Sequence, residues 1–274
     1  MRKTILNPVS VKGVGLHTGA PSTMTFKPAE NGIHFVRIDI AGSKPIKADL
    51  NHVGSTLRGT NLKNETAEVW TVEHVLSTLS ALGITDILVE MDGPEPPITD
   101  GSALVYAEHL KQAGLKELAE DLPVLVLKKP VTYSYGPISY SAEPSDTLSV
   151  TFIYEHAHPL VGRQEYTVEL NTENYMQQVA PARTFGFEEE LAFLKAHGLA
   201  KGGSLENAIV IGKEKYLHEL RFANELVRHK ILDLVGDFSL IGKRLPPLKI
   251  TCRMGGHKHN VLFGRLLLAN SEEK

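Results

Sequence analysis

The chain has 274 residues, of which 42% are hydrophobic and 22% charged, and its formal net charge is -3. This composition is typical of a globular protein with room for two ordinary domains or one large one. The scattered lysines and arginines exclude a nucleic-acid protein held by phosphate neutralisation, and the single cysteine, Cys252, excludes an internal disulfide and a thiolate-cluster metal site.

The N-terminus carries two positive charges but breaks at Asn7-Pro8, before an apolar stretch of signal-peptide length can form. No window approaches the roughly 18 uninterrupted apolar residues that indicate a transmembrane helix. We therefore expect a cytoplasmic protein without a transmembrane segment, and we favour a monomer.

The first motif, residues 13–19 (GVGLHTG), resembles a dinucleotide fingerprint but has one residue too many before its last glycine. Residues 22–26 (STMTF) then alternate like a strand and do not open a helix, so the phosphate-binding geometry of a Rossmann fold is missing and we reject that interpretation. The glycines permit a tight turn of the backbone, which would set the direction of the His17 side chain. A hydrogen-bonded turn histidine explains His17 equally well.

Residues 33–38 and 46–50 look like further strands. The spacing of apolar residues then changes from that of a strand to that of a helix. Apolar residues from Val72 to Leu82 recur at helical spacing. Thr71 is the predicted N-cap, and Glu73 lies in the first turn, where the helix dipole favours a carboxylate. Stabilisation of the helix N-terminus is one explanation for a carboxylate at Glu73. The functional account is that Glu73 and His74 project towards a common site, one as a base and one as a metal ligand.

Residues 84–90 predict a buried strand, after which a proline-rich turn leads to a helix over residues 103–113, capped by Asp or Ser. A short charged passage ends at Pro123, where we place the boundary between domains of residues 1–123 and 124–274. Further strand-like segments lie at residues 124–127, 131–135, 148–154 and 164–170.

Residues 183–187 (RTFGF) lead into a predicted helix over residues 188–197, followed by a glycine-rich passage and a short apolar strand at residues 208–211. The passage is not a Walker loop, because no Gly-Lys-Ser/Thr stands at the required spacing. Gly198 is explained as a helix C-cap, whereas the double glycine at 202 and 203 also allows close approach of a ligand chain.

The chain is organised around residues 227–242 (VRHKILDLVGDFSLIG). Their apolar side chains fall in one arc of a helix, while His229, Asp233 and Asp237, at i, i+4 and i+8, form a separate stripe. An imidazole and a carboxylate one turn apart can close on one metal ion, and Asp237 can orient a group beyond it. The alternative is a solvated helix face with a His/Asp pair.

Residues 248–252 predict a strand that ends at residues 255–260 (GGHKHN). The two glycines let the imidazole of His257 point away from the sheet, as a ligand or a proton donor. His257 and His259 also suggest a metal-dependent amidohydrolase. In those barrels, however, the pair sits on the first strand, and this chain lacks eight regular βα units.

The motifs GVGLHTG, TVEH, ITDGSA, ARTFGF, KGGS, RHKILDLVGD and GGHKHN occur in this order across nearly the whole chain. In order and spacing the chain resembles the zinc-dependent UDP-3-O-acyl-N-acetylglucosamine deacetylases of lipid A biosynthesis. The resemblance implies an α+β fold of two similar domains, each a mostly antiparallel sheet layered with helices. It also implies that the helices pack between the two sheets and that the site lies at the junction.

The resemblance further implies that His74, His229 and Asp233 hold Zn2+, a ligand set typical of hydrolytic rather than structural zinc. Glu73 is then the general base and His257 the general acid.

By the same resemblance Asp237 pairs with His257, Thr184 assists the oxyanion, and Lys230 lies near the nucleotide phosphates of an acylated UDP-sugar. The helix at 188–197, the glycine-rich passage and the following strand match an insert that forms a hydrophobic acyl passage. The expected substrate contacts are Lys230, His17, Phe185, Leu199, Gly203 and Ser204.

Two residues depart from the family pattern. Met254 stands where a basic residue usually helps to hold the diphosphate, a role that Arg253 can take over, and His259 stands where an apolar residue is expected. Two other hypotheses remain. One is a different zinc amidohydrolase acting on an N-acetyl sugar, with His257 and His259 as ligands. The other is a non-catalytic sugar-nucleotide or lipid-binding module in which the His/Asp stripe is structural.

Overall fold

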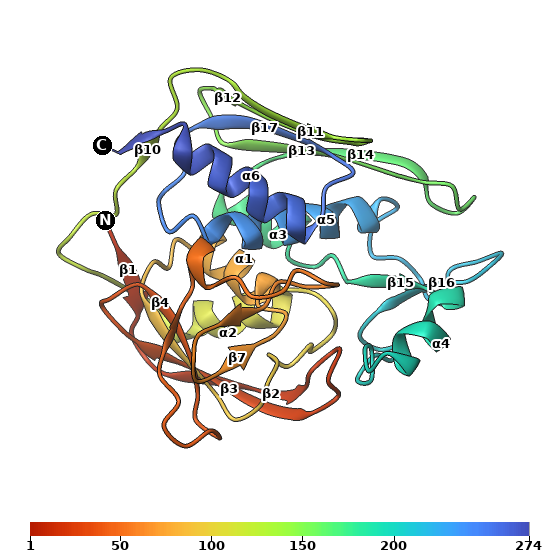
Figure 1. Cartoon of the computed structure of the whole chain (residues 1–274), viewed down its shortest axis with the longest axis horizontal. Coiled ribbons are helices and arrows are strands. Elements are labelled where there is room, and N and C mark those ends of the chain that lie inside the picture. The colour runs from red at the N-terminus through yellow and green to blue at the C-terminus, as the bar shows by residue number, and fades with distance from the viewer. Residues whose placement is uncertain (274) are drawn as a thin grey trace.

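The computed structural model describes residues 1–273 and contains two five-stranded sheets with helices between them (Figure 1). The elements in chain order are β1 Lys3–Ile5, β2 Val9–Val14, β3 Pro21–Pro28, β4 Ile33–Arg37, β5 Ile46–Lys47, the 3-10 helix η1 Leu50–His52, β6 Leu62–Lys63, β7 Glu68–Val69, α1 Glu73–Ala81, β8 Ile87–Met91, α2 Leu104–Ala113, β9 Leu115–Glu117, β10 Leu125–Val126, β11 Val131–Tyr135, β12 Ile138–Pro144, β13 Ser149–His156, β14 Gly162–Glu169, α3 Thr172–Gln178, β15 Phe185–Phe187, α4 Glu188–Ala196, β16 Ile209–Ile211, α5 Glu225–Ser239, β17 Leu248–Arg253, α6 His257–Ala269 and β18 Glu272–Glu273.

The two large sheets share one topology. The first has the strand order β2-β3-β8-β4-β5 and the second β11-β12-β17-β13-β14. Each contains a single parallel pair, with Phe35 of β4 opposite Val89 of β8 and Phe152 of β13 opposite Cys252 of β17. A parallel pair requires a crossover connection, and the two crossovers contain α1 and α5. The fold is thus repeated, although no repeat is visible in the amino-acid sequence.

Each sheet has one apolar face, which follows from the period of two along its strands. In β8 the side chains of Ile87, Val89 and Met91 are buried, and in β17 those of Leu248 and Ile250 are buried in the same alternation. These faces turn towards the helices, and one contiguous cluster of buried apolar side chains joins both sheets. The core therefore lies between the sheets, where the helices are.

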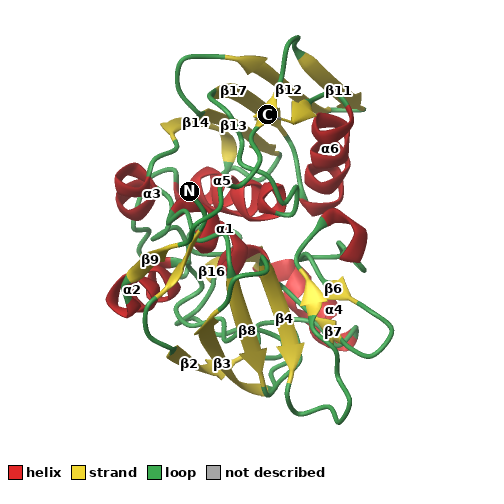
Figure 2. Cartoon of the chain, turned by 90° about the vertical axis from the view of Figure 1, so that its left-hand side faces the viewer, coloured by secondary structure: helices red, strands yellow, loops and turns green. Residues whose placement is uncertain are grey.

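Helices α1 and α5 pack against each other at the centre of the molecule (Figure 2). Both are buried along most of their length, so their polar side chains must find partners inside the protein. The helices approach closely at Gly236, where a Cβ atom would lie 2.1 Å from the carbonyl oxygen of Glu73. This glycine sets the distance between the two helices that carry most of the candidate residues.

A small βαβ unit stands beside the two sheets (Figure 1). Its strands β15 and β16 are parallel, with Phe185 opposite Ile209, and α4 connects them. Phe187, Ile209 and Ile211 form a separate apolar cluster with Leu226, a buried residue in the first turn of α5. The unit is therefore fixed to the start of the central helix.

The structure confirms the predicted α+β class with two similar layered halves and helices between the sheets. The predicted helices correspond to α1, α2, α4 and α5, whereas α3 and α6 were not predicted. The domain boundary at residue 123 stays a prediction. No helix among residues 1–273 has both the length and the apolarity needed to cross a bilayer.

Candidate metal centre and active site

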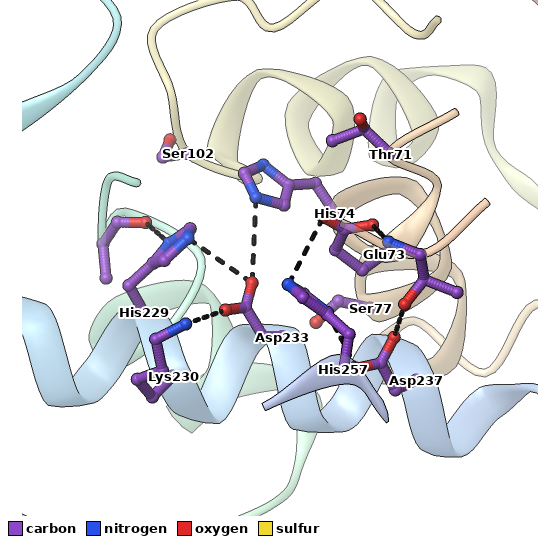
Figure 3. Close-up of polar contacts among 12 residues, drawn as sticks. Thr71, Glu73, His74, Ser77, Ser102, His229, Lys230, Asp233, Asp237 and His257 are labelled. Atoms are coloured by element: carbon purple, nitrogen blue, oxygen red, sulfur yellow. Dashed lines mark hydrogen bonds and ion pairs between the residues drawn. The ribbon is translucent and has the colours of Figure 1, made fainter. Parts of the chain in front are cut away.

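The candidate residues come from helices that meet at the centre of the molecule (Figure 3). Helix α5 carries His229, Asp233 and Asp237, so the predicted stripe lies on one helix as expected. Glu73 and His74 are the first two residues of α1, which packs on α5. The crossovers of the two halves thus place these five side chains next to one another.

A candidate metal centre lies where the two helices meet. One donor atom each from His74, His229 and Asp233 lies within 4.8 Å of the others. The Nε2 atoms of the two histidines are 3.9 and 3.4 Å from Asp233 Oδ1, and the three side chains are at most 5% exposed. Three lone-pair donors that converge in a buried space form a site for one cation.

The surroundings favour the metal-binding protonation state of all three donors. Burial, together with the neighbouring His229 imidazole, lowers the pKa of His74 to about 3, and burial also lowers the pKa of His229. Burial would raise the pKa of Asp233, but the Lys230 ammonium and the His229 imidazole hold it well below its usual range. Neutral imidazoles and an ionised carboxylate are the forms that bind metal ions.

A backbone carbonyl orients one of the imidazoles. His229 Nδ1 lies 3.1 Å from the carbonyl oxygen of Ala182, and because a carbonyl only accepts, Nδ1 carries the proton and Nε2 keeps its lone pair. The next residue, Arg183, bonds through Nε to buried Glu225 at 2.8 Å, which fixes this segment. The Nδ1 atom of His74 is buried and has no hydrogen-bond partner among residues 1–273.

A carboxyl group and an imidazole flank the metal centre. Burial raises the pKa of Glu73 to about 8. Burial would lower the pKa of His257, but the carboxylates of Asp237 and Glu73 outweigh it and raise that pKa to about 9. His257 Nδ1 donates to Asp237 Oδ2 at 3.0 Å, and Nε2 lies 4.0 Å from Glu73 Oε1. The site therefore contains one group suited to accept a proton and one suited to donate a proton.

The N-cap of α1 differs from the residue predicted from the sequence. Thr71 is not the N-cap: Val72 occupies that position and makes no side-chain cap hydrogen bond. Thr71 has a φ of 53°, which is rare for a β-branched residue, and its hydroxyl donates to Glu95 Oε1 at 2.7 Å. The prediction was wrong because a distant carboxylate, rather than the helix end, uses the hydroxyl.

Glu95 also anchors the first glycine-rich loop, which contains His17. Its buried carboxylate accepts the backbone N–H of His17 at 3.0 Å. The ring of His17 contacts two further segments, with Nε2 3.1 Å from the carbonyl oxygen of Arg58 and Nδ1 3.4 Å from the backbone nitrogen of Ala200. Both ring nitrogens thus engage backbone groups, as in the alternative of a hydrogen-bonded turn histidine. Its substrate-binding role stays a prediction.

Lys230 and Phe185 lie next to the candidate metal ligands, and Thr184 directly precedes Phe185 in the chain. Lys230 Nζ donates to Asp233 Oδ2 at 2.8 Å and lies 5.4 Å from the ring centre of Phe185. The sequence did not predict this contact between the ammonium and a candidate metal ligand. The backbone of Thr184 donates to the carbonyl of Gly101 at 2.8 Å, which ties the segment before β15 to the loop before α2.

The loop between α4 and β16 contains the predicted passage residues Leu199, Gly203 and Ser204. This loop pairs with the first glycine-rich loop, because the N–H of Gly202 donates to the carbonyl of Leu16 at 3.0 Å. A Cβ atom at Gly202 would lie 2.1 Å from the carbonyl oxygen of Gly15. Gly202 is therefore required where two loops of the protein meet. At Gly203 the nearest atom, the carbonyl oxygen of Ala200, would be 3.3 Å away, so a Cβ atom there would meet a tight contact but not the direct clash found at Gly202.

The two departures from the family pattern have specific surroundings. Arg253 donates through Nη2 to Glu155 at 2.6 Å, so its guanidinium is already paired. Met254 accepts the backbone N–H of Glu155 at its sulfur. His259 Nδ1 lies 2.8 Å from the hydroxyl of Tyr133 on β11. Among the described residues, the groups that can hold a metal include His257 but not His259.

Thr60 and Glu95 are buried polar residues that contact the candidate groups and were not predicted. Thr60 contacts both Glu73 and Asp237. Its neighbours in sequence form no periodic pattern, so only the folded chain reveals it. Glu95 gave no signal either, because a carboxylate in a proline-rich turn that also contains Asp92 and Asp100 is expected to be exposed.

The chain matches the family model of UDP-3-O-acyl N-acetylglycosamine deacetylase over residues 2–269. It is 40% identical over 275 residues to the UDP-3-O-acyl-N-acetylglucosamine deacetylase of Syntrophotalea carbinolica, covering 99% of this chain and 89% of the relative. It is 41% identical over 264 residues to the protein of that name from Synechocystis sp., covering 94% and 95%. The central His/Asp cluster thus lies in a chain that belongs to the UDP-3-O-acyl N-acetylglycosamine deacetylase family.

Proposed function

We propose that this protein is a zinc-dependent hydrolase that removes the N-acetyl group from UDP-3-O-[(3R)-3-hydroxyacyl]-N-acetylglucosamine, releasing acetate, in lipid A biosynthesis. One observation carries the proposal: His74, His229 and Asp233 converge in a buried cluster that Glu73 and His257 flank, in a member of this family. We also propose, from the sequence, that the protein acts in the cytoplasm as a monomer.

The donor set fits Zn2+. Two neutral imidazoles and one ionised carboxylate match the ligand types of hydrolytic zinc sites, and the proton of His229 is held on the nitrogen that faces away from the cluster. Zn2+ bound by His74, His229 and Asp233 supplies Lewis-acid polarisation of the substrate carbonyl and lowers the pKa of a nearby water. The ion also favours the charged carboxylate of Glu73, and so lowers the pKa of that group from its metal-free value.

Glu73 and His257 divide the two proton transfers. Glu73 accepts a proton from water as the water oxygen forms a bond to the acetamide carbon. His257, charged through its contact with Asp237, donates the Nε2 proton to the sugar nitrogen as the carbon–nitrogen bond breaks. The products are acetate and the free amine.

Two side chains complete the proposed chemistry. Thr184 is assigned to stabilise the negative charge that develops on the carbonyl oxygen of the substrate. It lies between Ala182, whose backbone carbonyl orients His229, and the start of β15. Lys230 provides a positive charge near the nucleotide phosphates. Its bond to Asp233 gives it a second role, since it keeps that ligand ionised.

The acyl chain is proposed to run beside the βαβ unit, with contacts from His17, Phe185, Leu199, Gly203 and Ser204. Each methylene that leaves water contributes roughly 0.8 kcal/mol, less the cost of ordering the chain. Gly203 supports this path because it is less tightly enclosed than Gly202. Its neighbour Gly202 is closed by the first glycine-rich loop and forms part of the wall.

Acetate release from the acylated sugar nucleotide tests the proposal. We expect one zinc per chain, as holoenzyme metal analysis would measure, and loss of both zinc and activity in His229→Ala. We expect kcat/KM for UDP-N-acetylglucosamine, which lacks the acyl group, to be several powers of ten lower, because the binding energy of the acyl chain is missing. Equal turnover of the two substrates would leave only a general N-acetyl-sugar deacetylase. Activity in zinc-free protein would contradict the zinc mechanism, and zinc binding without acetate release would favour a non-catalytic module.

A further inference from the structure

Asp237 is a fully buried carboxylate whose two oxygens are both engaged. Oδ1 accepts the hydroxyl of Thr60 at 2.5 Å, and Oδ2 accepts the side-chain nitrogen of Asn260 at 2.8 Å as well as His257 Nδ1 at 3.0 Å. Thr60 and Asn260 are neutral donors, so they fix the carboxylate without cancelling its charge. That charge remains available to the imidazole of His257.

Thr60 reaches both of the carboxylates that the proposed chemistry uses. Its backbone N–H donates to Glu73 Oε2 at 2.8 Å, while its hydroxyl donates to Asp237 Oδ1, and none of its surface is exposed. A hydroxyl has a single proton, which this contact occupies. One residue therefore fixes the position of the proposed base relative to the partner of the proposed acid.

The side chain of Asn260 is itself held by a hydrogen bond. The hydroxyl of Tyr140 donates to Asn260 Oδ1 at 2.6 Å, and both side chains are at most 2% exposed. Because Oδ1 accepts from the phenol, the amide nitrogen must face Asp237, which decides the orientation of the amide. The chain from Tyr140 through Asn260 thus holds the second oxygen of Asp237.

We propose that Thr60, Asn260 and Tyr140 form a positioning frame that fixes Asp237 and, through it, the imidazole of His257 opposite Glu73. The proposal rests on the proposed deacetylase function. The gap between the acid and the base, 4.0 Å from His257 Nε2 to Glu73 Oε1, determines whether both reach the same acetamide. Rotation of an unrestrained Asp237 carboxylate would turn the ring, and small misplacements of a reacting group are costly.

Substitution of Thr60 tests the frame. Thr60→Val keeps the shape and the backbone N–H but removes the hydroxyl, so we expect kcat to fall about tenfold with KM and zinc content unchanged. Thr60→Ser restores the hydroxyl and should recover most of kcat. Thr4→Val is the control, because Thr4 is 1% exposed and its hydroxyl binds the backbone of Ala29 instead. Unchanged kcat in Thr60→Val, or equal loss in Thr60→Ser, would overturn the frame.

A second variant covers the case in which Thr60→Val does not fold. Tyr140→Phe removes one oxygen and frees the Asn260 amide to rotate, so kcat should fall several-fold with zinc retained. Tyr166→Phe is the matched control, since that hydroxyl binds Gln178. Equal kcat in the two phenylalanine variants would refute the role of Tyr140. An unmodified zinc-loaded chain that releases no acetate would instead overturn the proposed function, and the frame with it.

Discussion

At the level of single residues, two neighbours on α1 have different proposed tasks. His74 points its Nε2 towards Asp233 in the metal centre, whereas Glu73 lies beside His257 and Thr60. Asp233→Ala should therefore lose most of the bound zinc. Glu73→Ala should keep the zinc and lose about 10²–10⁴-fold in kcat, because only the proton acceptor is removed. Metal analysis of both purified variants, alongside kcat, measures the difference.

Equal zinc loss in the two variants would assign Glu73 to the ligand set instead. Glu73→Gln is the matched control for packing, since it keeps the side-chain volume and removes only the basic oxygen. It should behave like Glu73→Ala in turnover and like the parent protein in thermal stability.

The pKa of the His257 imidazole determines where activity is expected to fall at alkaline pH. Its pKa is raised to about 9 by Asp237 and Glu73 against the effect of burial, so the proton-donating form is present below that pH and lost above it. A bound cation nearby lowers this pKa, so the basic limb of kcat should lie at or below about pH 9. His257→Gln should abolish the basic limb and lower kcat. A limb that persists unchanged in this variant would show that another group donates the proton.

The residues that the sequence could predict are those fixed by local spacing. His229, Asp233 and Asp237 share one face because a helix repeats every turn, and that geometry holds wherever the helix lies. Thr60 was out of reach because its contact with Asp237 joins residues 177 positions apart. The pairing of Lys230 with Asp233 was also missed, since helical spacing permits such a contact but does not require it.

At the level of elements, the close approach of α1 and α5 depends on Gly236. Alanine there would place Cβ 2.1 Å from the carbonyl oxygen of Glu73, so the helices must separate. We expect Gly236→Ala to lower the free energy of unfolding by about 1–3 kcal/mol and to weaken zinc binding, because His74 moves away from α5. Chemical denaturation and zinc titration measure the two effects.

Gly264→Ala in α6 is the control for this substitution. Its Cβ would meet no atom closer than 3.5 Å, and alanine is favoured over glycine inside a helix by roughly 0.5–1 kcal/mol. Gly264→Ala should thus be neutral or stabilising. A Gly236→Ala protein as stable as the parent, with full zinc affinity, would contradict the proposed role of the close helix contact.

The elements differed in how well their sequences predicted them. Helices α1 and α5 were predicted because apolar residues recur through them at helical spacing. Helix α6 was missed because it opens with His257, Lys258 and His259 after two glycines, a pattern that resembles a polar loop. Its N-cap, Gly256, makes no side-chain cap hydrogen bond, so the usual start signal is missing as well.

At the level of the whole molecule, the repeated topology explains the position of the site. Each half has a five-stranded sheet with one parallel pair, and each crossover places a helix on the apolar face of its sheet. When the two apolar faces meet, the crossover helices α1 and α5 become neighbours (Figure 2). The sequence could not show this repeat, because the two halves share a strand order and not a recognisable motif.

This division of the site between the halves has a consequence for how the protein matures. On the proposed ligand set, α1 contributes only His74, while His229 and Asp233 come from α5, about 150 residues later. A nascent chain that has completed its first sheet therefore holds only one of the three proposed ligands and cannot retain the ion. Zinc acquisition is then a late event in synthesis, which waits until α5 has left the ribosome and docked on α1.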